Sequence, residues 1–76
     1  MPAREVISLS AMEKVLKGAG ANRVSDEAKA ELRKVLEELG EKIGKEADEL
    51  SRHAGRRTIK AEDVRMASRV LKQQQQ

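Results

Sequence analysis

One apolar stripe constrains this chain more than any other feature. It runs through residues 25–54 at helical steps of three and four, the spacing of one face of an amphipathic helix. Its members are Ala28, Leu32, Val35, Leu36, Leu39, Ile43, Ala47, Leu50 and Ala54. Ser25 predicts an N-cap before the stripe, and Gly55 predicts a left-handed residue just behind it. Because the stripe keeps its phase through Gly40 and Gly44, the pattern predicts a single long helix.

The length of this helix limits the possible architecture. About 29 helical residues form a rod of roughly 43 Å, whereas a compact chain of 76 residues has a radius of gyration of about 11 Å. The shorter segments of one chain cannot cover such a rod. Gly40 and Gly44 lie beside the stripe, where they either admit a second helix closely or are merely tolerated at the surface. The simplest solution is an all-α fold in which two long helices cross in an intertwined dimer.

Two shorter helical patterns flank the long one. Ser10 begins a capping-box pattern for the first, although Ser8 is an alternative cap. Gly18 and Gly20 end this helix, and a last helix is predicted over residues 61–72. Short connections separate the three helices.

The connections and the chain ends complete the domain organisation. Residues 23–25 and 57–59 are extended enough to pair as very short strands. Residues 1–7 form an N-terminal extension and residues 8–72 the domain. The polar residues 73–76 have nothing to pack against and are expected to be a disordered glutamine tail.

Composition excludes several classes of function. The chain has no Cys and no aromatic residue, so there is no disulfide, thiolate metal site or stacking platform for single-stranded nucleic acid. It has one His, no phosphate-cradling glycine loop and no nucleophile elbow, so we expect no enzyme, cofactor, metal or small-molecule substrate. No apolar run reaches the roughly 18 residues of a membrane span. These features predict a soluble intracellular domain with no membrane partner.

Charge is distributed unevenly along the chain. Residues 1–24 carry a net charge of +2, residues 25–51 carry −4 and residues 52–76 carry +5. If the two connections lie together, their bases and those of the first helix form one patch. Its members are Lys14, Lys17, Arg23, Arg56, Arg57 and Lys60, with the hydroxyl of Thr58. Such a patch suits the phosphates of duplex DNA better than base edges, although a merely solvated surface is the alternative.

Two stretches of this sequence resemble a known family. Residues 18–28, GAGANRVSDEA, are similar to the first loop and the start of the central helix in archaeal histones. Residues 52–64, RHAGRRTIKAEDV, resemble their second loop and the start of their last helix. The similarity covers about residues 8–72. It implies a histone fold, with short, long and short helices in a handshake dimer. It also implies a cytoplasmic protein, associated with the chromosome in the nucleoid, that wraps duplex DNA largely without sequence specificity.

The resemblance also implies a role for particular residues. Arg23 matches the loop arginine that enters the minor groove, and Arg57 and Thr58 match phosphate contacts. With Ser25 as a backbone contact and with the basic first-helix positions, the expected DNA-binding set is Lys14, Lys17, Arg23, Ser25, Arg57, Thr58 and Lys60. The positions that join one dimer to the next match Leu50, His53 and Asp63. Arg56 and Asp63 match an ion pair within the chain.

Three acidic residues depart from the family pattern. Glu41, Asp48 and Glu49 place acid on an outer face where it weakens DNA binding or alters the stacking of dimers. The expected partners are double-stranded DNA and a second copy of the chain, with higher-order stacking and a heterodimer with another histone as further possibilities.

The alternative to a DNA-wrapping histone is a histone-fold interaction module. Such a module would belong to a transcription or chromatin-associated complex and would not itself wrap DNA.

Overall fold

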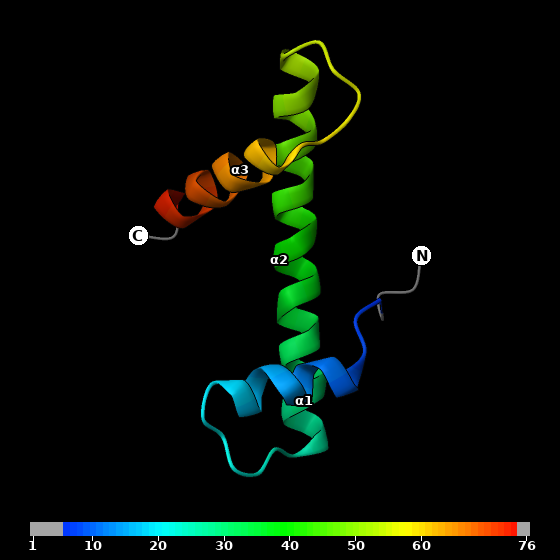
Figure 1. The fold of residues 1–76 in the computed structure, drawn as a ribbon, viewed down its shortest axis with the longest axis vertical. Coiled ribbons are helices and arrows are strands. Elements are labelled where there is room, and N and C mark those ends of the chain that lie inside the picture. The colour runs from blue at the N-terminus through cyan, green and yellow to red at the C-terminus, as the bar shows by residue number, and fades with distance from the viewer. Residues whose placement is uncertain (1–5, 75–76) are drawn as a thin grey trace. The chain divides into compact units, whose positions relative to one another are not determined.

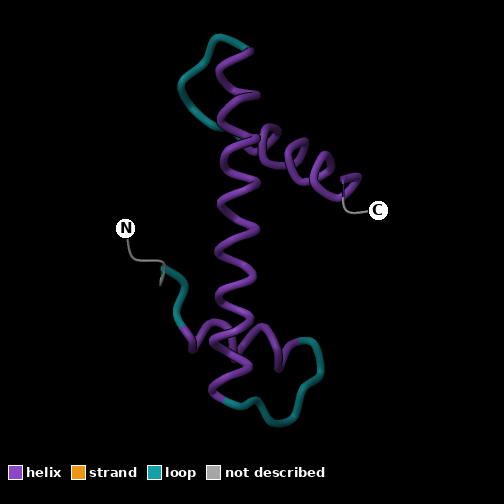
Figure 2. The backbone as a smooth tube through the Cα atoms, turned by 180° about the vertical axis from the view of Figure 1, so that it is seen from behind, coloured by secondary structure: helices purple, strands orange, loops and turns teal. Residues whose placement is uncertain are grey.

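A computed structural model of the chain describes residues 6–74. These residues form three helices, which are in chain order α1 (Leu9–Gly18), α2 (Asp26–His53) and α3 (Ala61–Gln74) (Figure 1). Helices and loops account for all of the described residues (Figure 2), which confirms the all-α class. The chain divides between Leu39 and Gly40 into two compact units, and α2 contributes to both.

The long central helix forms as its stripe predicts. α2 has 28 residues, which gives a length of about 42 Å. Ser25 caps it, because the Ser25 hydroxyl accepts a hydrogen bond of 3.0 Å from the backbone N–H of Ala28. The helix continues through Gly40 and Gly44, where an added Cβ would meet nothing within 4 Å. Both glycines therefore leave open space beside the helix of the single chain.

α1 and α2 each end in a backbone turn of the same type. After α1, the N–H of Ala21 donates to the carbonyl of Leu16 at 3.1 Å, across Gly20 at φ 112°. After α2, the N–H of Arg56 donates to the carbonyl of Ser51 at 3.0 Å, across Gly55 at φ 74°. These are Schellman turns, in which a residue of positive φ lets the chain satisfy the last carbonyls of a helix. The left-handed residue expected at Gly55 is confirmed.

The start of α1 differs from the capping-box expectation. Ser8, not Ser10, is the N-cap: its backbone is extended and its hydroxyl accepts from the N–H of Ala11 at 3.0 Å. Glu37 of α2 explains the choice, since its Oε2 accepts from the N–H groups of Val6 and Ile7 at 2.7 and 3.0 Å. These bonds hold the chain just before Ser8, so the helix begins there and Ser10 lies inside it.

The other end of the chain corrects the expected tail. α3 continues to Gln74, so Gln73 and Gln74 are helical rather than disordered. Glutamine is a good helix former, and no glycine or proline follows Lys72 to stop the helix. The last two residues of the expected tail, and residues 1–5 of the expected extension, lie outside the described part of the chain.

The two connections do not form strands. Residues 23–25 and 57–59 carry no strand in this chain (Figure 2). Three-residue segments of this kind gain their backbone hydrogen bonds only when another backbone lies beside them, and they lie in different units here. The expected pairing of these segments is absent from the single chain.

The apolar stripe is poorly covered by its own chain. Among the described residues, the buried hydrophobic side chains are Met12, Ala47 and Ala67. Val35 of the stripe is 48% exposed, and Val15 and Met66 on the shorter helices are 51% and 52% exposed. Three small or flexible side chains are too little for an independent core. This exposure is the pattern of a chain that completes its core by association.

Candidate nucleic-acid interface

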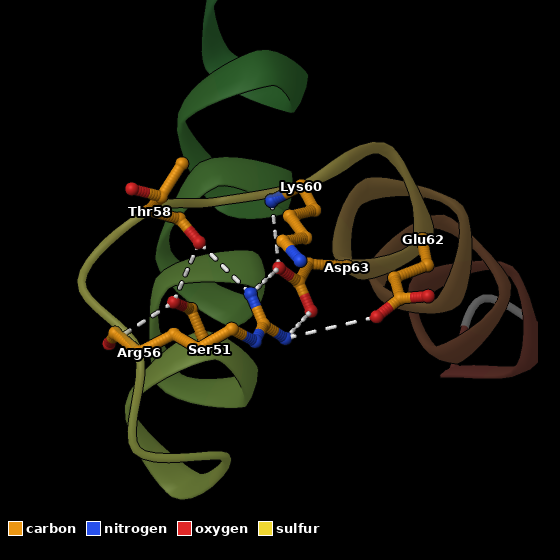
Figure 3. Close-up of polar contacts among 6 residues, drawn as sticks. All are labelled: Ser51, Arg56, Thr58, Lys60, Glu62 and Asp63. Atoms are coloured by element: carbon orange, nitrogen blue, oxygen red, sulfur yellow. Dashed lines mark hydrogen bonds and ion pairs between the residues drawn. The ribbon is translucent and has the colours of Figure 1, made fainter.

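The second loop, residues 54–60 between α2 and α3, is closed by an arginine fork. Nη1 of Arg56 donates to Oδ2 of Asp63, and Nη2 donates to Oδ1, both at 3.0 Å (Figure 3). Nη1 also donates to the backbone carbonyl of Thr58 at 2.9 Å, and Nη2 lies 3.8 Å from Oε2 of Glu62. The ion pair expected between Arg56 and Asp63 is therefore present, in the bidentate form that suits guanidinium and carboxylate.

Asp63 joins this fork to the start of α3. Its Oδ2 also accepts from the backbone N–H of Lys60 at 2.7 Å, which is half of a capping box, and its side chain is only 5% exposed. The hydrogen bonds from Arg56 and from the Lys60 N–H lower the pKa of Asp63 to about 2. The same contact with Asp63 raises the pKa of Arg56. The loop is thus fixed by a pair that is fully charged at neutral pH.

Ser51 is a site residue that the sequence did not reveal. It is 1% exposed, and its hydroxyl lies 2.9 Å from the carbonyl oxygen of Thr58 and 3.2 Å from that of Arg56. The single hydroxyl proton serves both carbonyls, so the loop backbone is tied to the side of α2 (Figure 3). The signal in the sequence is a polar residue next to Leu50 of the stripe, which by itself indicates only a tolerated small side chain.

Three polar side chains of the second loop are exposed to solvent. Arg57, Thr58 and Lys60 are all exposed, and within residues 6–74 neither Arg57 nor Lys60 takes part in an ion pair. The carbonyl of Thr58 points into the network while its hydroxyl points away from it (Figure 3). The loop therefore uses Arg56 and Asp63 internally and presents Arg57 and the hydroxyl of Thr58 to solvent, whereas the charge of the exposed Lys60 also helps to lower the pKa of Asp63.

The first-unit residues of the expected DNA-binding set have more varied surroundings. Lys17 pairs with Glu13 at 3.1 Å, whereas Lys14 has no such partner in the described chain. Ser25 uses its hydroxyl as the cap of α2. Arg23 is exposed, and no hydrogen bond or ion pair to residues 6–74 holds it. Of the four, Lys14 and Arg23 have no ion-pair partner among residues 6–74, so both are available to an anionic ligand.

Glu13 forms ion pairs with both Lys17 and Lys29. The hydrogen bond and charge of Lys17, with the charge of Lys29, lower the pKa of Glu13. Lys29 lies 3.7 Å from Glu13 and 3.1 Å from Asp26, and its hydrogen bond with Asp26 raises its pKa. These contacts bind α1 to the first turn of α2 through charge.

The structure brings the site residues together only in part. Arg56, Thr58, Lys60 and Asp63 meet in the second loop. The residues of the first loop and of α1 belong to the other unit, so a single basic patch stays a prediction. Of the positions expected between dimers, His53 is exposed at the end of α2, Leu50 is half-buried, and neither has a polar partner in the described chain.

Comparison with known proteins identifies the chain. A family model described as histone-like transcription factor (CBF/NF-Y) and archaeal histone matches residues 7–67. The chain belongs to this histone family. It is 46% identical over 61 residues to one of the subunits of archaeal histone HAN1 from Thermococcus zilligii, covering 80% of this chain and 91% of that protein. It is 43% identical over 56 residues to probable archaeal histone 3 of Methanocaldococcus jannaschii, covering 74% of this chain and 84% of that protein.

Family membership confirms the resemblance and the fold. The three helices of short, long and short length are those of a histone fold. In the part of this histone that the structure describes, no group of three His, Asp or Glu side chains is placed to hold a metal ion. Over the same residues, no helix is both long enough and apolar enough to cross a membrane.

Proposed function

We propose that this histone packages duplex DNA as a homodimer, by neutralising phosphates with loop cations and inserting Arg23 into the minor groove. The proposed contacts are with the DNA phosphates and with the minor groove, whose shape rather than base edges is recognised. The base sequence therefore contributes little. Lys14, Lys17 and Ser25 add contacts beside the first loop, as Arg57, Thr58 and Lys60 do in the second. The affinity falls steeply with salt, because each neutralised phosphate releases counterions.

The observation that supports this proposal is the fixed backbone of the second loop, together with its exposed hydrogen-bond donors. Its backbone is held by Ser51 and by the Arg56–Asp63 fork before any ligand arrives. The outward side chains of Arg57 and Thr58 are a guanidinium and a hydroxyl, both of which donate to phosphate oxygens.

A second copy of the chain supplies the rest of the core. The half-exposed Val35 and the open space at Gly40 and Gly44 support two α2 helices that cross closely. A heterodimer with a different histone would use the same surface. The chain would then wrap DNA only together with that partner.

The dimers stack further through Leu50, His53 and Asp63. Oδ1 of Asp63 accepts only from Nη2 of Arg56 in the described chain, so it can accept one more bond from His53 of a neighbouring dimer. An imidazolium donates a stronger hydrogen bond to a carboxylate than a neutral imidazole does, so protonation of His53 strengthens this contact. Sedimentation should show larger assemblies at about pH 6 than at about pH 8, and His53→Ala should abolish the difference. Equal assembly size at both pH values would refute this contact.

Nuclease digestion tests the packaging function. Purified protein is mixed with random-sequence duplex DNA and the complex is digested with a nonspecific nuclease. Regularly stepped protected fragments are expected if stacked dimers wrap the duplex, and one fragment size would indicate a closed particle. A folded protein that protects nothing at low salt would contradict packaging and favour an interaction module, since the matching family also includes histone-like transcription factors.

A further inference from the structure

Three arginines and one acid line a pocket beside the second loop. The pocket has a volume of about 430 Å³, and its walls are Asp48, Arg52, Arg56 and Arg57. One water occupies about 30 Å³ in the liquid, so the pocket has room for a polyatomic anion with its hydration. Its lining carries more cationic than anionic charge, which favours an anion as the occupant.

The three guanidinium groups are not equally available. Arg56 is committed to Asp63 and to the carbonyl of Thr58. Arg57 is exposed, and no ion pair within residues 6–74 holds it. Arg52 stands between these cases, because its Nε lies 3.1 Å from Oδ2 of Asp48 one helical turn earlier.

The contact between Arg52 and Asp48 is weak enough to exchange. The Arg52 side chain is 76% exposed and that of Asp48 is 43% exposed. Solvated pairs of this kind contribute little to stability, because water screens the charges and two flexible side chains must be held in place. Arg52 can therefore turn away from Asp48 toward a stronger anion.

We propose that this pocket binds a phosphate group through Arg52 and Arg57, and that Asp48 attenuates the binding by competing for Arg52. A guanidinium fork takes two oxygens of a phosphate, which a single carboxylate oxygen at Nε does not match. The proposal deepens the DNA function, on which it rests where the phosphate belongs to DNA. A free phosphate offers the same oxygens, so both sources are tested separately.

A double-mutant cycle on DNA affinity tests the competition. Asp48→Asn should tighten binding to a duplex about two- to fivefold, the range of a solvated ion pair, and Arg52→Ala should weaken it. In the Arg52→Ala background, Asp48→Asn should have little effect, because no arginine remains to be released. Glu49→Gln removes an adjacent exposed acid outside the pocket, and Lys45→Ala removes an exposed cation outside it, so these variants report charge alone.

The salt dependence separates a phosphate contact from a structural effect. Asp48→Asn should steepen the slope of log affinity against log salt by up to about 0.9 for each pocket engaged, and a helix effect would leave the slope unchanged. Circular dichroism of each variant checks that the helices persist. If Asp48→Asn gains as much without Arg52 as with it, or no more than Glu49→Gln, the competition is refuted.

Pyrophosphate distinguishes failure of this site from failure of the DNA function. Titrated into the free protein, it should shift the Nε–H resonances of Arg52 and Arg57 more than that of Arg69 on α3. Asp48→Asn should tighten the binding. If duplex DNA does not bind but these shifts occur, the pocket is supported and the packaging function is not. Equal shifts at all three arginines would overturn the pocket whatever the DNA result.

Discussion

The two loops of this histone begin with the same backbone turn and differ in what holds them afterwards. Each leaves its helix through a glycine at positive φ. The second loop is then tied by Ser51, Arg56 and Asp63, whereas in the described chain the first is anchored at its far end by the cap at Ser25. Under the proposed function, a loop whose own side chains fix its backbone would present phosphate contacts in a preset geometry. A loop with few ties would let its arginine adapt to the width of a groove.

Breaking the arginine fork should have the largest effect of all. Arg56→Ala leaves the buried carboxylate of Asp63 without its guanidinium and removes one donor from the carbonyl of Thr58. Unpaired buried charge is strongly destabilising, so the midpoint of thermal unfolding should fall further than for any other single substitution in the two loops. Arg56→Lys should recover only part of the loss, since lysine has no fork. Arg57→Ala is the matched control, and an equal fall in that variant would contradict the comparison.

The contribution of the Arg56–Asp63 pair to stability should depend on pH. The folded-state pKa of Asp63 is about 2, below its ordinary value of 3.8, so the ionised form is the one that folding stabilises. Its contribution is fully present above about pH 4 and is lost as the pH falls toward 2. Asp63→Asn should lower stability at neutral pH and flatten the acid limb of a denaturation series. Glu49→Gln changes an exposed carboxylate of α2 that has no ion pair within residues 6–74, and should keep the wild-type shape of that limb.

The shared turn should respond alike in both loops. Gly20→Ala and Gly55→Ala place a Cβ in open space but at positive φ, which should cost about 1–2 kcal/mol at each position. Gly18→Ala is the control, because Gly18 is helical, has open space and lacks a positive φ, so it should gain up to about 1 kcal/mol. Chemical denaturation measures all three. A much larger loss at Gly55 would show that its turn and the side-chain ties act as one unit.

Sequence reasoning predicted what depends on spacing along the chain. The apolar stripe, the cap at Ser25 and the turn at Gly55 are periodic or local signals, and all three are present. The pair of Arg56 and Asp63 came from family resemblance, and the distances bear it out.

What sequence reasoning missed depends on contacts between distant residues. Ser8 and Ser10 have the same capping chemistry, and Glu37, which lies 30 residues from Ile7, decides between them. Ser51 acquires its role only when the carbonyl of Thr58 folds back beside it. Pairing of the two connections requires a second backbone, which no pattern within one chain supplies.

The smallest expected effect on stability, and the clearest on function, is at Arg23. Because Arg23 is exposed and has no polar partner among residues 6–74, Arg23→Ala should change the free energy of unfolding by no more than about 0.5 kcal/mol. Its DNA affinity should nevertheless fall for every duplex sequence, because the cation that we propose to enter the minor groove is lost. Arg23→Lys keeps the charge but loses the planar fork, so it separates simple neutralisation from insertion. Lys34→Ala, which removes an exposed cation of the same unit outside the expected DNA-binding set, is the control. If affinity at moderate salt is unchanged in Arg23→Ala, the weakly tied first loop does not contact the groove, and the preset second loop alone carries the binding.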